Sequence, residues 1–166
     1  MPMPMPPSSS AATPEAPSRG FGVSLKGRAL RLLSAREHSR AELVSKLAPH
    51  ETTPGELERA LDELQAKGFI NEQRVLESVL FRKAGKLGAA RVKQALQAKG
   101  LDPEAIAEAV TELQGSEELR ARDVWQKKFG VVPTNEIERA RQMRFLLARG
   151  FAPSSIRRVI VSSSDE

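Results

Sequence analysis

Apolar residues recur every three or four positions from Val23 to Ile160, and polar residues fill the positions between them. This spacing places the apolar side chains of each segment on one face of an α-helix. Glycine, proline and capping residues interrupt the pattern at short intervals. The pattern therefore predicts an all-α chain without β-sheet, with helices at about residues 25–33, 40–47, 54–67, 75–80, 92–99, 103–113, 117–125, 135–149 and 153–160.

Capping sequences indicate where several of these helices begin. Residues 39–42 (Ser-Arg-Ala-Glu) have the spacing of a capping box, in which a hydroxyl and a carboxylate bind each other's backbone N–H groups. Residues 53–56 (Thr-Pro-Gly-Glu) repeat that spacing, with Pro54 expected at the first helical position. Asp102 and Ser116 are predicted to cap the helices that follow them.

One pattern occurs three times along the chain. Leu47, Leu96 and Leu146 each precede a proline by seven residues, and Pro54, Pro103 and Pro153 each precede a Leu or Ile by three. The repeat of 49 to 50 residues predicts three copies of a three-helix unit. The first copy has Glu51 where the others have Gly100 and Gly150, so we expect its turn to be built differently, through Pro49.

The repeat divides the chain into consecutive units. We expect a disordered arm rich in Pro, Ser and Ala over residues 1–22, three-helix repeats over 23–69, 70–115 and 116–161, and a short tail over 162–166. A unit of this size buries little apolar surface alone, so adjacent copies are predicted to pack together. The expected architecture is three repeats stacked into an elongated body.

Composition excludes several classes of protein. The 166 residues include no Cys and only two His, so disulfides, thiolate metal sites and thiol catalysis are excluded. The absence of Cys fits the reducing cytoplasm, where we expect the protein to reside. No apolar stretch is long enough to cross a membrane, and the prolines of the first residues do not fit a signal peptide.

Charge is segregated along the chain. Six bases and no acid lie between Glu77 and Asp102, six acids and no base occupy residues 102–118, and six bases and no acid occupy residues 139–158. The second helix of each repeat is therefore basic, whereas the third is acidic in the first two repeats. A segregated surface of this kind can steer the protein toward an acidic partner, although a solvated helix face is the simpler interpretation of any one run.

The chain offers no set of residues typical of catalysis or metal binding. His38 adjoins the cap at Ser39, which favours packing over general-base chemistry, and His50 stands in a proline-rich turn without a second His nearby. Residues 85–88 lack the Lys-Ser/Thr ending of a phosphate-binding loop and predict an interhelix turn. Trp125 is predicted to anchor the core of the third repeat. We therefore expect a protein that is not an enzyme and uses no metal or cofactor.

Several segments resemble the RecX family, bacterial regulatory proteins of the RecA recombinase. They are ALRLLSAREHSRAELVSKL at residues 29–47, KGFINEQRV at 67–75, and the segments at 99–106 and 149–156 with the pattern Lys/Arg-Gly-apolar-x-Pro-x-x-Ile. The resemblance covers roughly residues 25–160. It departs from the family pattern from Asn71 onward, where the family tends to have an acidic residue followed by aromatic ones.

The resemblance implies a function and a partner. It implies a non-catalytic, all-helical chain that binds the RecA filament on single-stranded DNA and inhibits RecA ATPase, strand-exchange and co-protease activity in recombination, DNA repair and the SOS response. We expect a monomer that binds DNA weakly at most without RecA. Two alternatives stay open, a stand-alone nucleic-acid-binding helical module and a helical-repeat adaptor for another protein.

The basic second helices and the residues before the fifth helix provide the candidate contact surface. Exposed bases at equivalent positions of the repeats are predicted to meet carboxylates or bound DNA on the partner. The predicted contact residues are Arg40, Lys46, Arg82, Lys83, Lys86, Arg91, Lys93, Arg139, Arg141 and Arg144.

Overall fold

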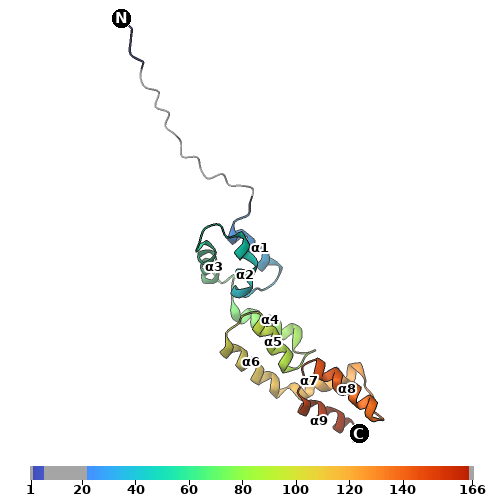
Figure 1. Cartoon of the computed structure of the whole chain (residues 1–166). Coiled ribbons are helices and arrows are strands. Elements are labelled where there is room, and N and C mark those ends of the chain that lie inside the picture. Colours follow the sequence, from blue (N-terminus) through green and yellow to red (C-terminus); the bar gives the residue numbers. More distant parts are fainter. Residues whose placement is uncertain (1, 6–21, 165–166) are drawn as a thin grey trace.

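The computed structural model describes residues 2–5 and 22–164 of the chain (Figure 1). Across these residues the secondary structure is helical and contains no strand, so the predicted fold class is confirmed. The helices are α1 (Leu25–Ala35), α2 (Arg40–Leu47), the 3₁₀ turn η1 (Ala48–His50), α3 (Glu56–Ala66), α4 (Glu72–Lys83), α5 (Ala89–Ala98), α6 (Pro103–Gly115), α7 (Glu117–Lys128), α8 (Glu136–Ala148) and α9 (Pro153–Ser164).

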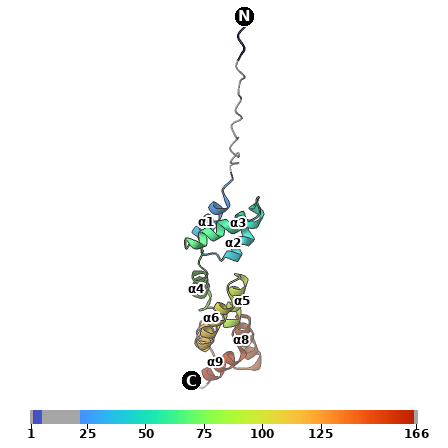
Figure 2. The same ribbon diagram turned by 90° about the vertical axis from the view of Figure 1, so that its left-hand side faces the viewer.

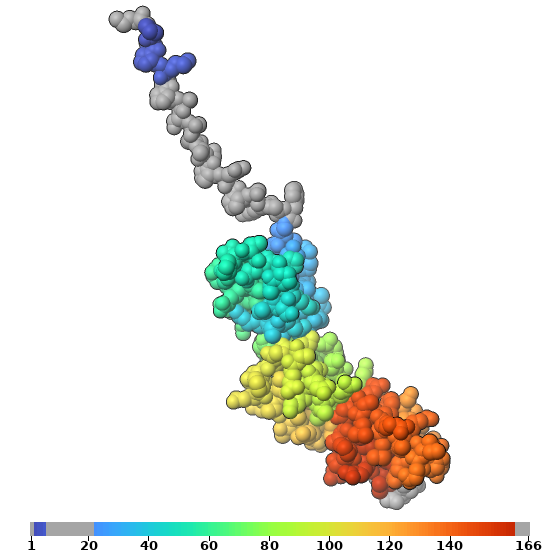
Figure 3. All heavy atoms as spheres, in the orientation of Figure 1, coloured from blue at the N-terminus to red at the C-terminus, as the bar shows by residue number. Residues whose placement is uncertain are grey.

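The helices form three consecutive groups, α1–α3, α4–α6 and α7–α9, which we call repeats 1, 2 and 3. They follow one another along an elongated body (Figures 1 and 2). The space-filling view shows the three repeats as successive blocks, with repeat 2 between repeats 1 and 3 (Figure 3). The arm predicted at residues 1–22 falls mostly outside the described residues, and so do residues 165 and 166 of the predicted tail.

Each repeat has its own apolar core. Leu43, Leu61 and Leu64 are fully buried in the core of repeat 1. In repeat 2 the core contains the fully buried Val79, Val92 and Leu96. In repeat 3 it contains the fully buried Leu146, Ile156 and Val159. These residues are the apolar positions of the sequence pattern, so the helical periodicity located the cores correctly.

Trp125 lies in the core of repeat 3, as predicted. Its side chain is buried with Leu146 and Ile156, and its indole N–H donates to Oε1 of Gln142 at 2.8 Å. The amide of Gln142 in turn donates to the carbonyl oxygen of Val131 at 3.0 Å. The buried indole therefore has the polar partner that its N–H group requires.

The capping box predicted at residues 39–42 is present, whereas the one predicted at 53–56 is wrong. In α2 the Ser39 hydroxyl accepts from the N–H of Glu42, and the Glu42 carboxylate accepts from the N–H of Ser39. Helix α3 begins only at Glu56, because Gly55 before it adopts a left-handed conformation with φ 83°. Pro54 therefore precedes the helix instead of opening it.

The turn of repeat 1 uses Pro49 and Glu51. Pro49 lies in η1, which continues directly from α2, as expected from its place in the sequence. The carboxylate of Glu51 then accepts from the N–H of Leu57 at 3.1 Å, in the first turn of α3. Glu51 thus caps α3 from outside the helix, which the sequence pattern did not reveal.

The caps of α6, α7 and α4 agree with the sequence only in part. Asp102 caps α6 as predicted, because its carboxylate accepts from the N–H of Ala105. Ser116 precedes α7, but its hydroxyl donates to the carbonyl oxygen of Leu113 and does not cap that helix. Asn71 is a cap that the pattern missed: it accepts from the N–H of Arg74, so α4 begins three residues earlier than predicted.

Candidate partner-binding surface

The second helices of the repeats, α2, α5 and α8, are joined end to end. The N–H of Gly88, before α5, donates to the carbonyl oxygen of Arg149, at the end of α8, over 2.8 Å. In the same way the hydroxyl of Ser39, before α2, donates to the carbonyl oxygen of Lys99, at the end of α5. The three helices thus form a head-to-tail column along the body, and Figure 2 shows α2, α5 and α8 in succession.

Glycines allow the helix ends of this column to meet. Gly100 and Gly150 follow α5 and α8 with φ of 67° and 88°, the left-handed conformation that ends many helices. A Cβ atom on Gly100 would lie 2.7 Å from the Cβ of Ala41, and one on Gly88 would lie 2.2 Å from the carbonyl carbon of Gly150. The glycines that the sequence pattern assigned to turns are therefore also contact points between repeats.

A buried carboxylate bridges repeats 2 and 3. Glu117, at the start of α7, is only 5% exposed. Its Oε1 accepts from the N–H of Ala89 at 2.9 Å, and its Oε2 accepts from the N–H of Ala152 at 3.4 Å and from the Ser155 hydroxyl at 3.1 Å. Because it lies at the N-termini of both α5 and α9, it caps two helices from different repeats.

Arg120 satisfies the carbonyl groups on the other side of this joint. Its guanidinium donates to the carbonyl oxygens of Ala84, Leu87 and Leu113 at 2.6 to 2.8 Å. These groups belong to the ends of α4 and α6 and to the turn before α5. Glu117 and Arg120 together provide hydrogen-bond partners for N–H and carbonyl groups at helix ends that have no partner within their own helix.

Glu42 has the corresponding role between repeats 1 and 2. Its carboxylate binds Arg36 at 2.8 Å and Lys99 of repeat 2 at 3.1 Å, and its side chain is 12% exposed. Burial alone raises the pKa of Glu42, but hydrogen bonds from Arg36, from the Ser39 N–H and from Lys99 outweigh burial and lower the pKa to about 2. Folding therefore favours the ionised carboxylate.

We expect Glu42→Gln to lower the free energy of unfolding by about 3 kcal/mol at pH 7. The lowered pKa contributes stability above the unfolded-state value of 4.5, and this contribution is lost as the pH falls from 4.5 toward 2. Urea unfolding between pH 2 and 7 measures both effects. The variant should depend less steeply on pH than the wild-type chain in this range.

Glu63 provides the matched control. Hydrogen bonds from Lys26 and Lys67 lower its pKa to about 2 as well, but the Glu63 side chain is exposed to solvent. Because solvent screens exposed pairs, Glu63→Gln should change the stability little. Equal losses in the two variants would show that the joint adds nothing to an ordinary surface pair.

The predicted contact residues of α5 and α8 lie along the column. Lys93, Arg141 and Arg144 are exposed, and Arg139 is half-buried. Arg91 is exposed too, although its Nε donates to the carbonyl oxygen of Ala148 across the joint at 3.0 Å. The cations of these two helices therefore belong to one continuous part of the body.

The predicted contact residues of α2 are bound within repeat 1. The guanidinium of Arg40 pairs with Asp62 at 2.6 Å and donates to Gln65 at 2.8 Å. Nζ of Lys46 lies 3.3 Å from Nε2 of the buried His38, and burial lowers the pKa of that imidazole. His38 is thus a packed residue, as predicted. Both cations of α2 have polar side-chain partners within repeat 1.

Arg82, Lys83 and Lys86 lie at the end of α4 and in the turn before α5, where the sequence predicted a turn. Arg82 and Lys86 are exposed, and Lys83 is half-buried. Lys86 borders a hollow of about 310 Å³ between repeats 2 and 3.

The hollow gathers cations that the sequence analysis did not select. Lys127 and Lys128 of α7 and Arg149 after α8 line it together with Lys86, and no acidic residue does. Lys128 and Arg149 lie over the ring of Phe145, at 5.5 and 4.9 Å from its centre. The pair at 127 and 128 is visible as a charge run in the sequence, but only the packing of α7 on its neighbours places it beside Lys86.

Within the described residues no helix is long and apolar enough to span a lipid bilayer. The same part of the chain contains no group of three or more His, Asp or Glu side chains arranged to hold a metal ion.

Comparisons with known proteins agree with this architecture. Residues 26–64 match the domain family described as "RecX, first three-helix domain", and residues 117–160 match "RecX, third three-helix domain". The chain is 49% identical over 138 residues to the "Regulatory protein RecX" of Leptothrix cholodnii, which covers 83% of this chain and 88% of that protein. It is 46% identical over 138 residues to the protein of the same name from Ralstonia nicotianae, covering 83% and 87%.

The fold also resembles a solved structure. The crystal structure of RecX from Lactobacillus salivarius aligns with a TM-score of 0.66 at 20% sequence identity, covering 86% of this chain and 96% of that one. The two domain matches, the relatives and the stack of three-helix repeats lead to one conclusion. The chain belongs to the RecX family of non-catalytic regulatory proteins.

Proposed function

We propose that the chain regulates RecA by binding along the RecA filament on single-stranded DNA and lowering its ATPase, strand-exchange and co-protease activity. The observation that supports this most is the head-to-tail column, because it places the exposed cations of α5 and α8 in two successive repeats along the body. A filament presents the same surface again and again along its axis. An elongated stack can therefore meet several filament subunits with equivalent helices.

Binding alone is sufficient for such regulation. A protein that binds one state of the filament more tightly than another shifts the filament toward that state without any chemical step. Each exposed ion pair contributes only about 0.2 to 1 kcal/mol, so the contact must be spread over many residues. We further propose that the chain acts as a monomer in the cytoplasm.

The test is the single-strand-dependent ATPase of RecA, measured with increasing amounts of this chain. We expect inhibition at amounts well below one chain per RecA subunit, because one bound chain affects a run of connected subunits. A RecA ATPase that stays constant even with the chain in excess would contradict the proposal.

Direct binding to nucleic acid is the second candidate function, and the basic hollow beside Lys86 supports it. A protein of this kind would bind single-stranded DNA tightly without RecA, and its affinity would fall steeply as salt is added. The filament proposal predicts weak DNA binding by the chain alone. Fluorescence anisotropy with labelled DNA at two salt concentrations separates the two functions.

A further inference from the structure

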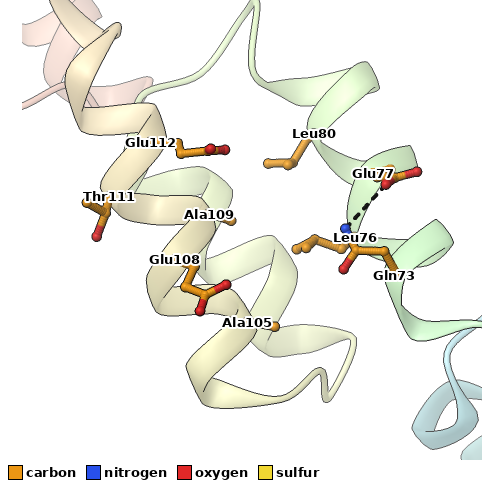
Figure 4. Close-up of a pocket in the computed structure, with 9 residues that line it drawn as sticks. All are labelled: Gln73, Leu76, Glu77, Leu80, Ala105, Glu108, Ala109, Thr111 and Glu112. Atoms are coloured by element: carbon orange, nitrogen blue, oxygen red, sulfur yellow. Dashed lines mark hydrogen bonds between the residues drawn. The ribbon is translucent and has the colours of Figure 1, made fainter.

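Repeat 2 contains a groove between its first and third helices, α4 and α6 (Figure 4). The groove encloses about 630 Å³. Leu76 and Leu80 of α4 face Ala105 and Ala109 of α6 across its floor, and Leu76 and Ala109 are buried. The floor is thus apolar, with small side chains on one wall.

The other two repeats close the corresponding space. In repeat 1 helix α1 packs against α3, and in repeat 3 helix α7 packs against α9. In repeat 2 both α4 and α6 pack against α5 but hardly touch each other. The groove is therefore a local departure from the architecture of the repeat.

Carboxylates line the edges of the groove. Glu77 lies on the α4 side, and Glu108 and Glu112 lie on the α6 side (Figure 4). Glu77 accepts a hydrogen bond from Gln73 at 3.2 Å, and among the described residues none of the three carboxylates forms an ion pair within 4.0 Å. No Lys or Arg lines the groove. The rim is negative and lacks internal counter-charges.

The groove and the cations of the column lie on different faces of repeat 2. Helix α5, which carries Arg91 and Lys93, packs against both walls, and none of its residues lines the groove. An acidic rim repels DNA and acidic protein surfaces, which are the partners that the column attracts. The groove therefore suits a partner of the opposite chemistry.

We propose that this groove binds an amphipathic, positively charged helix of a protein partner. Apolar side chains at helical spacing would cover Leu76, Leu80 and Ala109, and Lys or Arg residues flanking that stripe would pair with Glu77, Glu108 and Glu112. This binding site is additional to the proposed contact with RecA and does not depend on it. It gives the chain two docking faces of opposite charge.

A synthetic peptide tests the site in the absence of RecA. The probe is a 15-residue amidated helix with Leu at positions 2, 6, 9 and 13, Lys at the positions flanking that stripe and Ala elsewhere. Titration calorimetry should give a dissociation constant in the range of tens of micromolar, and NMR shifts should concentrate in α4 and α6. A peptide with Glu in place of every Lys should not bind.

Variants of the rim decide whether the groove is the site. The triple variant Glu77→Gln, Glu108→Gln and Glu112→Gln should weaken binding of the Lys peptide at least tenfold. Glu58→Gln, Glu104→Gln and Glu136→Gln remove the same charge from exposed positions outside the groove and should change affinity less than twofold. Circular dichroism melting confirms that both variants remain folded.

Three results would overturn the proposal. Equal binding of the Lys peptide to both triple variants, or no binding at 1 mM peptide, would mean that the groove is not a docking site for a cationic helix. Sedimentation velocity showing dimers of the chain alone that the rim variant abolishes would assign the groove to a second copy instead. None of these results affects the RecA ATPase test, in which the rim variant should inhibit like the wild-type chain.

Discussion

Gly88→Ala is expected to lower the free energy of unfolding by about 3 kcal/mol or more and to loosen repeat 3 from repeat 2. The added Cβ would lie 2.2 Å from the carbonyl carbon and oxygen of Gly150. A flexible side chain could relieve this clash by changing rotamer, but these are backbone atoms. Gly88 has a φ of −74°, which alanine adopts freely. The expected loss therefore comes from packing at the joint alone.

The neighbouring Gly85 supplies the control for this experiment. A Cβ at Gly85 meets no atom within 4 Å, so Gly85→Ala should leave stability nearly unchanged. Urea unfolding followed by fluorescence is informative because the chain has one Trp, Trp125, which reports on repeat 3. Small-angle scattering measures the relative placement of the repeats. If the two alanine variants behave alike, the helix ends do not meet as closely as described.

Reversing the charge of Arg82, Lys86, Arg91 and Lys93 to Glu should abolish inhibition of the RecA ATPase. These residues supply the cations of repeat 2 near and along the column, and their reversal replaces attraction to an acidic partner by repulsion. Reversing the acidic set Glu104, Glu108 and Glu112 should affect inhibition much less. The measurement is the protein concentration that halves the ATPase rate.

One contact requires a second version of this experiment. Because Arg91 donates to the carbonyl oxygen of Ala148, its reversal can weaken the joint as well as the docking face. A set with Arg144 in place of Arg91 avoids this contact, and melting curves check that both sets remain folded. If the acidic set proves more damaging to inhibition than either basic set, the contact face is wrongly assigned.

The helices and their buried faces were predictable from sequence, whereas contacts between repeats were not. The spacing of apolar residues correctly placed Leu43, Val92 and Leu146 in the cores. A helix that buries one face has apolar residues every three or four positions, and this spacing is visible in the sequence. The predicted cap at Ser116 is wrong because its hydroxyl donates to the carbonyl oxygen of Leu113. The next residue, Glu117, caps helices that begin elsewhere in the chain, which the sequence did not indicate. No spacing rule connects residues 28 or 35 positions apart.

The candidate site shows the same division. Sequence identified the basic runs of α5 and α8, but it did not reveal that Arg40 is bound to Asp62 or that Lys127 and Lys128 lie beside Lys86. It also could not reveal the groove between α4 and α6, since that space depends on how far two helices lie from each other. Charge pattern predicts which helices carry cations, and tertiary packing decides which cations are available.

The head-to-tail column has a direction, and this direction determines where the array can be extended. Each joint needs a glycine after the second helix of the later repeat, as at Gly100 and Gly150, so that the helix start of the earlier repeat can approach it. After α2 the corresponding position is Glu51, which is engaged in capping α3. A designed repeat placed before repeat 1 would find no glycine after α2 to dock on, whereas one placed after repeat 3 would bring its own glycine to the start of α8, which no other repeat contacts among the described residues.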